Sequence, residues 1–200
     1  MYEKYIKRII DVLLSTVLLI LTSPFLLLAA IAMKIEHFRE PILFRQLRCG
    51  KNAKPFTIYK LRSMSSSAPP NVATEALDSD AYISRLGRLL RITSIDEIPQ
   101  LYNIWIGDMS FIGPRPVILQ ETELIELRKK LGVYAVKPGI TGLAQINGRD
   151  QLGNEEKAAL DSEYVHSICF RTDCAIFFRT IPAVLARRGI KEVEKNEHHE

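Results

Sequence analysis

The longest apolar stretch of the chain lies near its N-terminus, from Val12 to Met33, and contains no charged residue. As a continuous helix it would extend about 33 Å at about 1.5 Å per residue, which matches the hydrocarbon thickness of a bilayer. Ser23 and Pro24 lie near its middle, where a proline removes a backbone hydrogen bond and bends a helix. The pattern predicts a membrane helix broken at Ser23-Pro24, in which the serine hydroxyl compensates for the backbone group left unpaired.

Two membrane topologies are compatible with this segment. The break leaves two arms of about 18 and 14 Å, and neither arm spans a bilayer alone. Basic residues flank the segment on both sides: Lys4, Lys7 and Arg8 precede it, and Lys34, Arg39, Arg45 and Arg48 follow it. The positive-inside rule then places both ends in the cytoplasm, so we expect a re-entrant, monotopic helix. A kinked helix that crosses the bilayer completely is the alternative, because proline is tolerated in spanning helices.

Alternating polar and β-prone residues follow this helix, over residues 42–64. Two short runs around a Gly-Lys-Asn turn predict a β-hairpin or an irregular basic platform. Lys60 and Arg62 alternate with Tyr59 and Leu61, which places both cations on one face of a strand. That face either binds an anion or is simply solvated.

Helical periodicity returns over residues 81–92, where arginines 85, 88 and 91 recur every third residue beside a leucine-rich face. Such a helix suits a membrane interface, with arginines near lipid phosphates. Further helices are expected over 118–131 and 160–188, the latter interrupted at Pro182. The predicted fold class is α+β and mainly helical: a membrane helix (1–36), a small cytoplasmic globular domain with a β-hairpin and interfacial amphipathic helices (37–190), and a charged, frayed tail (191–200).

The composition limits the kinds of site and partner that the protein can have, but it does not decide the function. Three cysteines show no metal-type spacing, which argues against a disulfide scaffold and against a zinc site. The chain has 27 Lys+Arg against 23 Asp+Glu, a net charge of +4. This mild basic bias favours anionic partners such as phosphates or acidic phospholipid, and we expect no nucleic-acid partner.

The stretch TSIDEIPQL carries the most informative pair of acids, Asp96 and Glu97. Ser94 to Glu97 matches the S-x-x-E capping box, so the structural interpretation is a helix start capped by Ser94. The positive end of a helix dipole also keeps a carboxylate ionised and attracts phosphate. An ionised aspartate there can coordinate magnesium or attack phosphorus, with Arg91 or Arg115 neutralising the charge on the phosphate.

Two further basic positions suit phosphate binding. Pro114 and Pro116 fix the backbone on either side of Arg115 and so restrict where its guanidinium points. The segment KPGITGLAQINGRD combines three glycines with Lys137 and Arg149, which permits close backbone approach to a ligand. Beside a membrane helix, these cations predict a soluble phosphate donor and a lipid acceptor.

Four segments in this order, LFRQLRCGKNAKPFTIYKLRSM, RLGRLLRITSIDEIPQLYNIWIGDMSFIGPRP, KPGITGLAQINGRD and LDSEYV, resemble the small monotopic phosphoglycosyl transferases, a bacterial sugar transferase family. The resemblance implies transfer of a sugar 1-phosphate from a UDP-sugar to polyprenyl (undecaprenyl) phosphate, with release of UMP. It also implies a location at the cytoplasmic face of the bacterial inner membrane, with phospholipid as a partner.

The same resemblance implies the roles of individual residues. Asp96 would be the nucleophile that forms a phosphosugar-aspartyl intermediate and binds the Mg²⁺ cofactor, and Glu97 would assist with metal or proton handling. Lys60, Arg91 and Arg115 are similar to the family's phosphate-binding cations, and similarity also marks Arg149 and Asp161, without a defined role. Two alternatives are direct attack by the lipid phosphate, with the acids only binding metal, and a non-catalytic scaffold that binds acidic lipid.

Overall fold

The computed structural model describes residues 1–65, 67, 82–148 and 151–185, and the predicted tail (191–200) lies outside them. The chain is mainly helical, as predicted. Its helices are α1 (Lys7–Glu36, preceded by a π-helical turn), α2 (Arg85–Ile92), α3 (Gln100–Ile106), α4 (Thr122–Lys130), α5 (Leu143–Ile146), α6 (Asn154–Ser167) and α7 (Phe170–Leu185). The strands are β1 (Leu43–Cys49), β2 (Pro55–Leu61), β3 (Ser110–Ile112) and β4 (Gly139–Thr141).

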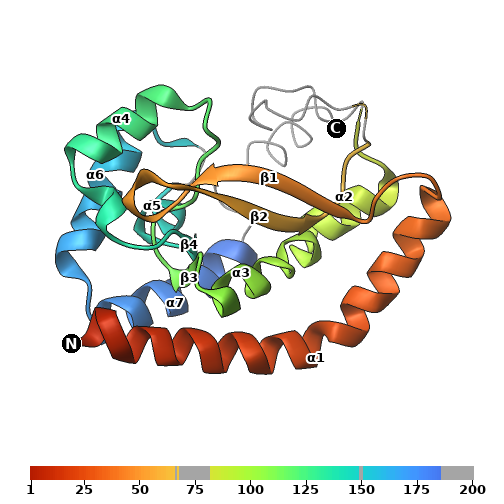
Figure 1. Cartoon of the computed structure of the whole chain (residues 1–200), viewed down its shortest axis with the longest axis horizontal. Coiled ribbons are helices and arrows are strands. Elements are labelled where there is room, and N and C mark those ends of the chain that lie inside the picture. The colour runs from red at the N-terminus through yellow and green to blue at the C-terminus, as the bar shows by residue number, and fades with distance from the viewer. Residues whose placement is uncertain (66, 68–81, 149–150, 186–200) are drawn as a thin grey trace.

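Strands β1 and β2 form the predicted hairpin, with Leu43 opposite Leu61 and Cys49 opposite Pro55. The connection at residues 50–54 contains Asn52 in the left-handed conformation, which asparagine tolerates well. The short strands β3 and β4 pair in parallel and form a second sheet. Figure 1 shows the hairpin on one side of the molecule and α1 along the opposite side, with α3 and the β3–β4 pair between them.

Helix α1 extends beneath the globular part and then turns upward, as Figure 1 shows. It contains Pro24, which cannot donate the helical hydrogen bond to the carbonyl of Ile20. The Ser23 hydroxyl donates to that carbonyl oxygen at 2.8 Å. The predicted compensation by the Ser23 hydroxyl is therefore confirmed, whereas the predicted break is not seen, because α1 continues as one helix through Pro24.

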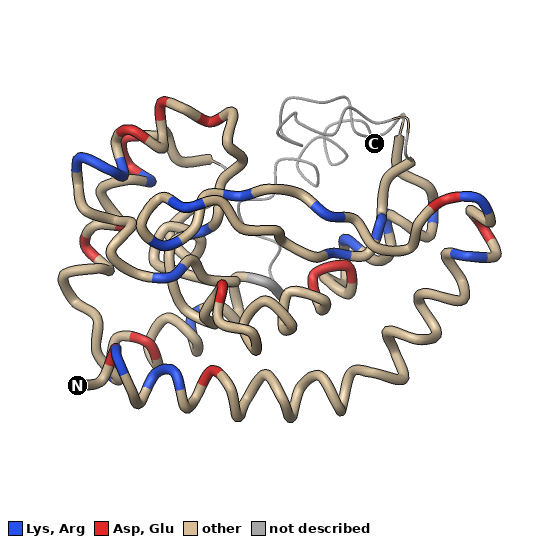
Figure 2. The backbone as a smooth tube through the Cα atoms, viewed as in Figure 1, with Lys and Arg blue, Asp and Glu red and all other residues tan. Residues whose placement is uncertain are grey.

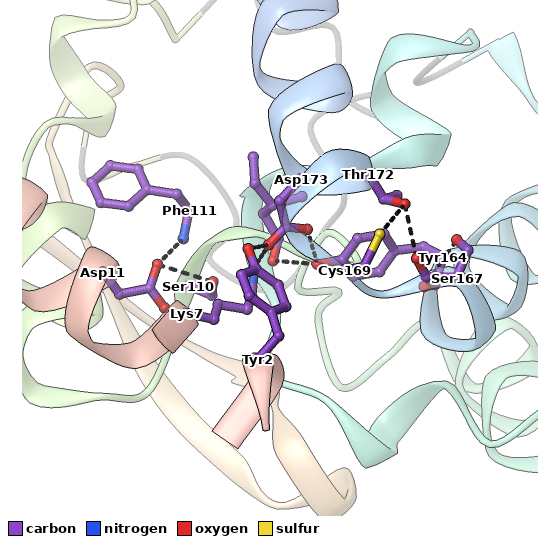
Figure 3. Close-up of polar contacts among 11 residues, drawn as sticks. Tyr2, Lys7, Asp11, Ser110, Phe111, Tyr164, Ser167, Cys169, Thr172 and Asp173 are labelled. Atoms are coloured by element: carbon purple, nitrogen blue, oxygen red, sulfur yellow. Dashed lines mark hydrogen bonds and ion pairs between the residues drawn. The ribbon is translucent and has the colours of Figure 1, made fainter. Parts of the chain in front are cut away.

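Polar side chains near the N-terminal end of α1 bind it to the globular part, as drawn in Figure 3. The Lys7 ammonium lies 2.6 Å from the Asp173 carboxylate of α7, and both side chains are largely buried. Asp11 accepts from the Ser110 hydroxyl and the Phe111 amide of β3, each at 3.1 Å. These partners lie about a hundred or more residues away along the chain, so the sequence pattern did not reveal them.

The C-terminal half of α1 also packs on the globular part. Ala29 and Met33 form a buried apolar cluster with Leu61 of β2 and Leu90 of α2. The remaining apolar side chains of α1 are largely exposed, and this helix (Tyr2–Glu36 including its first turn) is the one described helix long and apolar enough to cross a membrane. One helix thus contacts the same domain near both of its ends while presenting a long apolar face outward.

The C-terminal helices differ from the prediction in where they break. The expected interruption at Pro182 is wrong, because Pro182 lies inside α7. The break falls instead at Ile168 and Cys169, between α6 and α7. Tyr164 of α6 is buried there and donates to Asp173 of α7 at 2.8 Å, so tertiary packing sets this boundary rather than proline.

Candidate active site

The acidic pair lies beneath the hairpin, in the 3-10 turn Ile95–Glu97 between α2 and α3. Figure 2 shows acidic positions in the turn between α2 and α3, and a hairpin whose strands carry several basic positions. The Lys60 ammonium lies 2.6 Å from the Glu97 carboxylate, with 19% and 20% of the two side chains exposed. Burial lowers the pKa of Lys60, and the Glu97 charge opposes that shift. The structure therefore brings Lys60, a predicted phosphate-binding cation, to the acidic pair.

Asp96 is the buried member of the pair, with 7% exposure. Burial raises the pKa of Asp96 to about 6, the positive charge of Lys60 opposes this, and the negative charge of Glu97 adds to it. The Ser63 hydroxyl lies 3.5 Å from its carboxylate. A positive charge next to such a carboxylate, whether a lysine, an arginine or a metal ion, favours its ionised form.

The predicted capping box at Ser94 is wrong. Ser94 adopts the left-handed conformation (φ 56°) and its side chain makes no capping hydrogen bond. The helix that follows, α3, begins only at Gln100. The expectation that a helix terminus keeps Asp96 ionised is also wrong, because burial dominates and shifts its pKa upward. The turn is held instead by backbone bonds, including Glu97 N–H to the Ser94 carbonyl at 3.2 Å.

Two of the predicted arginines contribute charge to the site. Arg91, in the last turn of α2, lies close enough for its charge to lower the pKa of Asp96. The charge of Arg115 lowers the pKa values of Lys60 and Arg48, which places its guanidinium among these cations. Among the described residues, the Arg115 guanidinium forms no hydrogen bond or ion pair, so its donors remain available to an anion.

Two other predicted cations are not placed in this group. Arg62 follows the end of β2, donates through Nε to the Pro41 carbonyl at 2.9 Å, and lies over the Phe44 ring. Arg149 lies outside the described residues. Pro114 and Pro116, in contrast, are buried on either side of half-buried Arg115.

Sequence reasoning missed two residues that support the site. Ser63 contacts Asp96 from the segment after β2, and Asn103 of α3 is fully buried. The Asn103 amide accepts from Tyr59 N–H at 3.1 Å and donates to the Thr57 carbonyl at 2.7 Å. Because this amide binds the backbone of β2, it fixes α3 and the adjacent acidic turn against the strand that carries Lys60. An asparagine within a short helix gave no signal of this role.

The donor set suits a magnesium ion that is shared with substrate. No group of three or more acidic, histidine or cysteine residues suited to a metal occurs within residues 1–65, 67, 82–148 and 151–185. Mg²⁺ is commonly held by one or two carboxylates together with substrate phosphates and water. The buried Asp96 carboxylate, with Glu97 beside it, fits that arrangement.

Comparison with known proteins identifies the family. The family described as Bacterial sugar transferase matches residues 2–187. The chain belongs to this family. The uncharacterized sugar transferase EpsL of Bacillus subtilis (strain 168) is 39% identical over 189 residues, which cover 94% of this chain and 91% of that protein. The resemblance inferred from the four segments is thus confirmed, and the chain is a sugar-phosphate transferase of the phosphoglycosyl transferase type.

Two relatives have names that state a reaction. The UDP-glucose:undecaprenyl-phosphate glucose-1-phosphate transferase of Caulobacter vibrioides is 39% identical over 187 residues, covering 90% of this chain and 69% of that protein. The protein of the same name from Escherichia coli (strain K12) is 40% identical over 191 residues, covering 90% of this chain and 40% of the relative. The bacterial sugar transferase chain therefore corresponds to only part of the E. coli protein.

Proposed function

We propose that this bacterial sugar transferase moves a sugar 1-phosphate from a UDP-sugar to polyprenyl phosphate, producing a polyprenyl diphosphate sugar and UMP. The observation that carries this proposal is the buried Asp96 carboxylate near Lys60 and Arg91, with Arg115 near Lys60, in a domain bound to an apolar helix. The reactions named for the Caulobacter and E. coli relatives support the substrate pair.

The first step uses Asp96 as the nucleophile. A carboxylate oxygen forms a bond to the sugar-proximal phosphorus, the bond from that phosphorus to the bridging oxygen breaks, and UMP leaves with the electron pair. Lys60 and Arg115 stabilise the charge that develops on the transferred phosphoryl oxygens, in a site that excludes much of the solvent. Mg²⁺, when bound, supplies Lewis-acid stabilisation of phosphate oxygens, and Asp96 and Glu97 would hold it.

The second step regenerates the carboxylate. An oxygen of polyprenyl phosphate attacks the phosphorus of the phosphosugar-aspartyl intermediate, and the acyl-phosphate bond breaks. The Lys60 ammonium, 2.6 Å from the Glu97 carboxylate, opposes protonation of the freed Asp96, because its positive charge lowers the pKa that the Glu97 charge raises. The products are the polyprenyl diphosphate sugar and free Asp96.

The acceptor must reach this site from the membrane, and a re-entrant α1 would permit this. Its two ends contact one domain, through Lys7 with Asp173 and through Met33 with Leu61 and Leu90. A fully crossing helix would have to release one of these ends. We therefore propose a monotopic protein at the cytoplasmic face of the bacterial inner membrane, with α1 seated among phospholipids. Labelling of single cysteines at both ends of α1 in sealed vesicles tests this, and opposite-side accessibility would contradict it.

Asp96→Asn tests the reaction. Purified protein is incubated with a UDP-sugar and polyprenyl phosphate, and UMP and lipid-linked sugar are measured. Because a neutral amide is a poor nucleophile, the variant is expected to lose roughly 1000-fold or more of its activity. Asp108→Asn, in the loop after α3, is the matched control and should retain activity. Full activity of Asp96→Asn would refute the catalytic assignment, and an inactive wild type with every UDP-sugar would favour the scaffold.

A further inference from the structure

The four consecutive carbonyl groups from Pro114 to Val117 each accept a hydrogen bond from a different donor. Pro114 O accepts from Gly139 N–H at 2.9 Å, and Val117 O accepts from Cys49 N–H at 2.9 Å. The two carbonyls between them are bound by guanidinium groups: Arg115 O by Arg128 at 2.8 Å and Pro116 O by Arg48 at 3.3 Å. Because the two prolines have no N–H groups, these carbonyls provide most of the backbone bonds available to the segment.

Arg128 is itself held by a buried ion pair. Its guanidinium, on α4, lies 2.5 Å from the carboxylate of Asp161 on α6, with side-chain exposures of 3% and 1%. A charge buried this deeply is tolerated only when it is paired, and a guanidinium can donate to two acceptors at once from its rigid fork. One group therefore connects α6 to the peptide that follows Arg115.

We propose that Arg128 and Asp161 position Arg115 for its role in binding the donor diphosphate. The side chain of Arg115 has no protein partner among the described residues, so its direction depends on its own backbone. That backbone is fixed by the bond from Arg128 and by the flanking prolines. Asp161, which the sequence marked without a role, is thus a positioning residue that orients Arg128. This inference rests on the proposed function.

Arg128→Lys is the first test. A lysine preserves the charge paired with Asp161, but its single ammonium is not matched to both the carboxylate and the Arg115 carbonyl. The variant is expected to fold and to show about a tenfold fall in kcat/KM for the UDP-sugar, the order of effect for one lost hydrogen bond to a charged group. Lys129→Ala on the same helix, which removes an exposed pair with Glu126, is the control and should match the wild type.

A second variant separates positioning from stability. Replacing both partners, Arg128→Met with Asp161→Leu, removes the bond to Arg115 O without leaving a buried charge unpaired, and such exchanges are often neutral in stability. It should unfold near the wild-type temperature and still show the same loss of kcat/KM. If Arg128→Lys does not fold, this pair of substitutions provides the test.

Repeating the Arg128 substitutions in an Arg115→Ala background shows whether Arg128 acts through Arg115. If Arg128 acts through Arg115, either change at Arg128 should reduce kcat/KM by less than about twofold in an Arg115→Ala background, because the group to be positioned is gone. An equal loss in both backgrounds, or wild-type activity in folded variants, would overturn the inference while leaving the proposed function intact. Absence of UMP release by the wild type would overturn the proposed function, and this inference with it.

Discussion

Replacing Asp96 with asparagine should make the folded protein more stable at neutral pH. Burial raises the pKa of this carboxyl from 3.8 to about 6, so the folded state disfavours the ionised form that the unfolded chain accepts readily. At about 1.4 kcal/mol per pKa unit, this pKa difference corresponds to about 3 kcal/mol of folding stability, which is lost as the pH rises from the unfolded pKa of 3.8 to the folded pKa of about 6. Asparagine resembles the neutral acid and avoids that loss.

The assay is denaturant unfolding of the detergent-solubilised protein with a chelator present, at pH 8 and at pH 4. Asp96→Asn should exceed the wild type by up to about 3 kcal/mol at pH 8 and by less than about 1 kcal/mol at pH 4, where the wild-type carboxyl is largely protonated in the folded state. Glu126→Gln, an exposed member of an ion pair on α4, should change stability by less than about 0.5 kcal/mol at either pH. A wild type as stable as Asp96→Asn at pH 8 would refute the argument that burial penalises this carboxylate.

Three further predictions follow from the same geometry. The kcat/KM for the UDP-sugar should fall about tenfold per pH unit below about pH 6, as Asp96 becomes protonated, and a flat profile from pH 5 to 8 would argue against its nucleophilic role. Ser94→Gly should raise the free energy of unfolding by about 1 kcal/mol, because φ is 56° there and the side chain makes no capping hydrogen bond. A lower thermal unfolding temperature for this variant would instead show that the Ser94 side chain stabilises the turn. Asp11→Ala should lower the free energy of unfolding by about 2–5 kcal/mol, since it leaves the buried Ser110 hydroxyl and the Phe111 amide without their acceptor. Asp11→Asn keeps an acceptor oxygen and should lower it by less. A loss under about 1 kcal/mol for the alanine variant would show that these hydrogen bonds contribute little to holding α1 on the domain.

Local patterns predicted a large part of this molecule. The hairpin, the helix that carries Arg91, and the Ser23 hydrogen bond beside Pro24 all follow from short-range periodicity or from proline chemistry, and each is present. Strand alternation marked Lys60 as a candidate anion-binding cation, and the resemblance made it similar to the family's phosphate-binding cations, but its ion pair with Glu97 was not predicted.

Contacts between distant segments were not predictable from such patterns. The Ser94 capping box matched in sequence, yet the chain turns sharply between α2 and Asp96, and that turn requires a left-handed residue. Lys7 with Asp173, Asn103 with β2, and Arg128 with Asp161 each join elements far apart along the chain. Burial of Asp96, which sets the direction of its pKa shift, likewise depends on how these elements assemble.

Detection of a covalent intermediate on Asp96 tests the proposed mechanism most directly. The wild type is mixed with a UDP-sugar in the absence of polyprenyl phosphate, quenched rapidly, and measured by intact mass and peptide mapping. We predict one sugar-phosphate adduct per chain on the peptide that contains Asp96, an equal amount of released UMP, and no adduct with Asp96→Asn. UMP release that requires the lipid, with no adduct at any quench time, would contradict the covalent route and favour direct attack by the lipid phosphate.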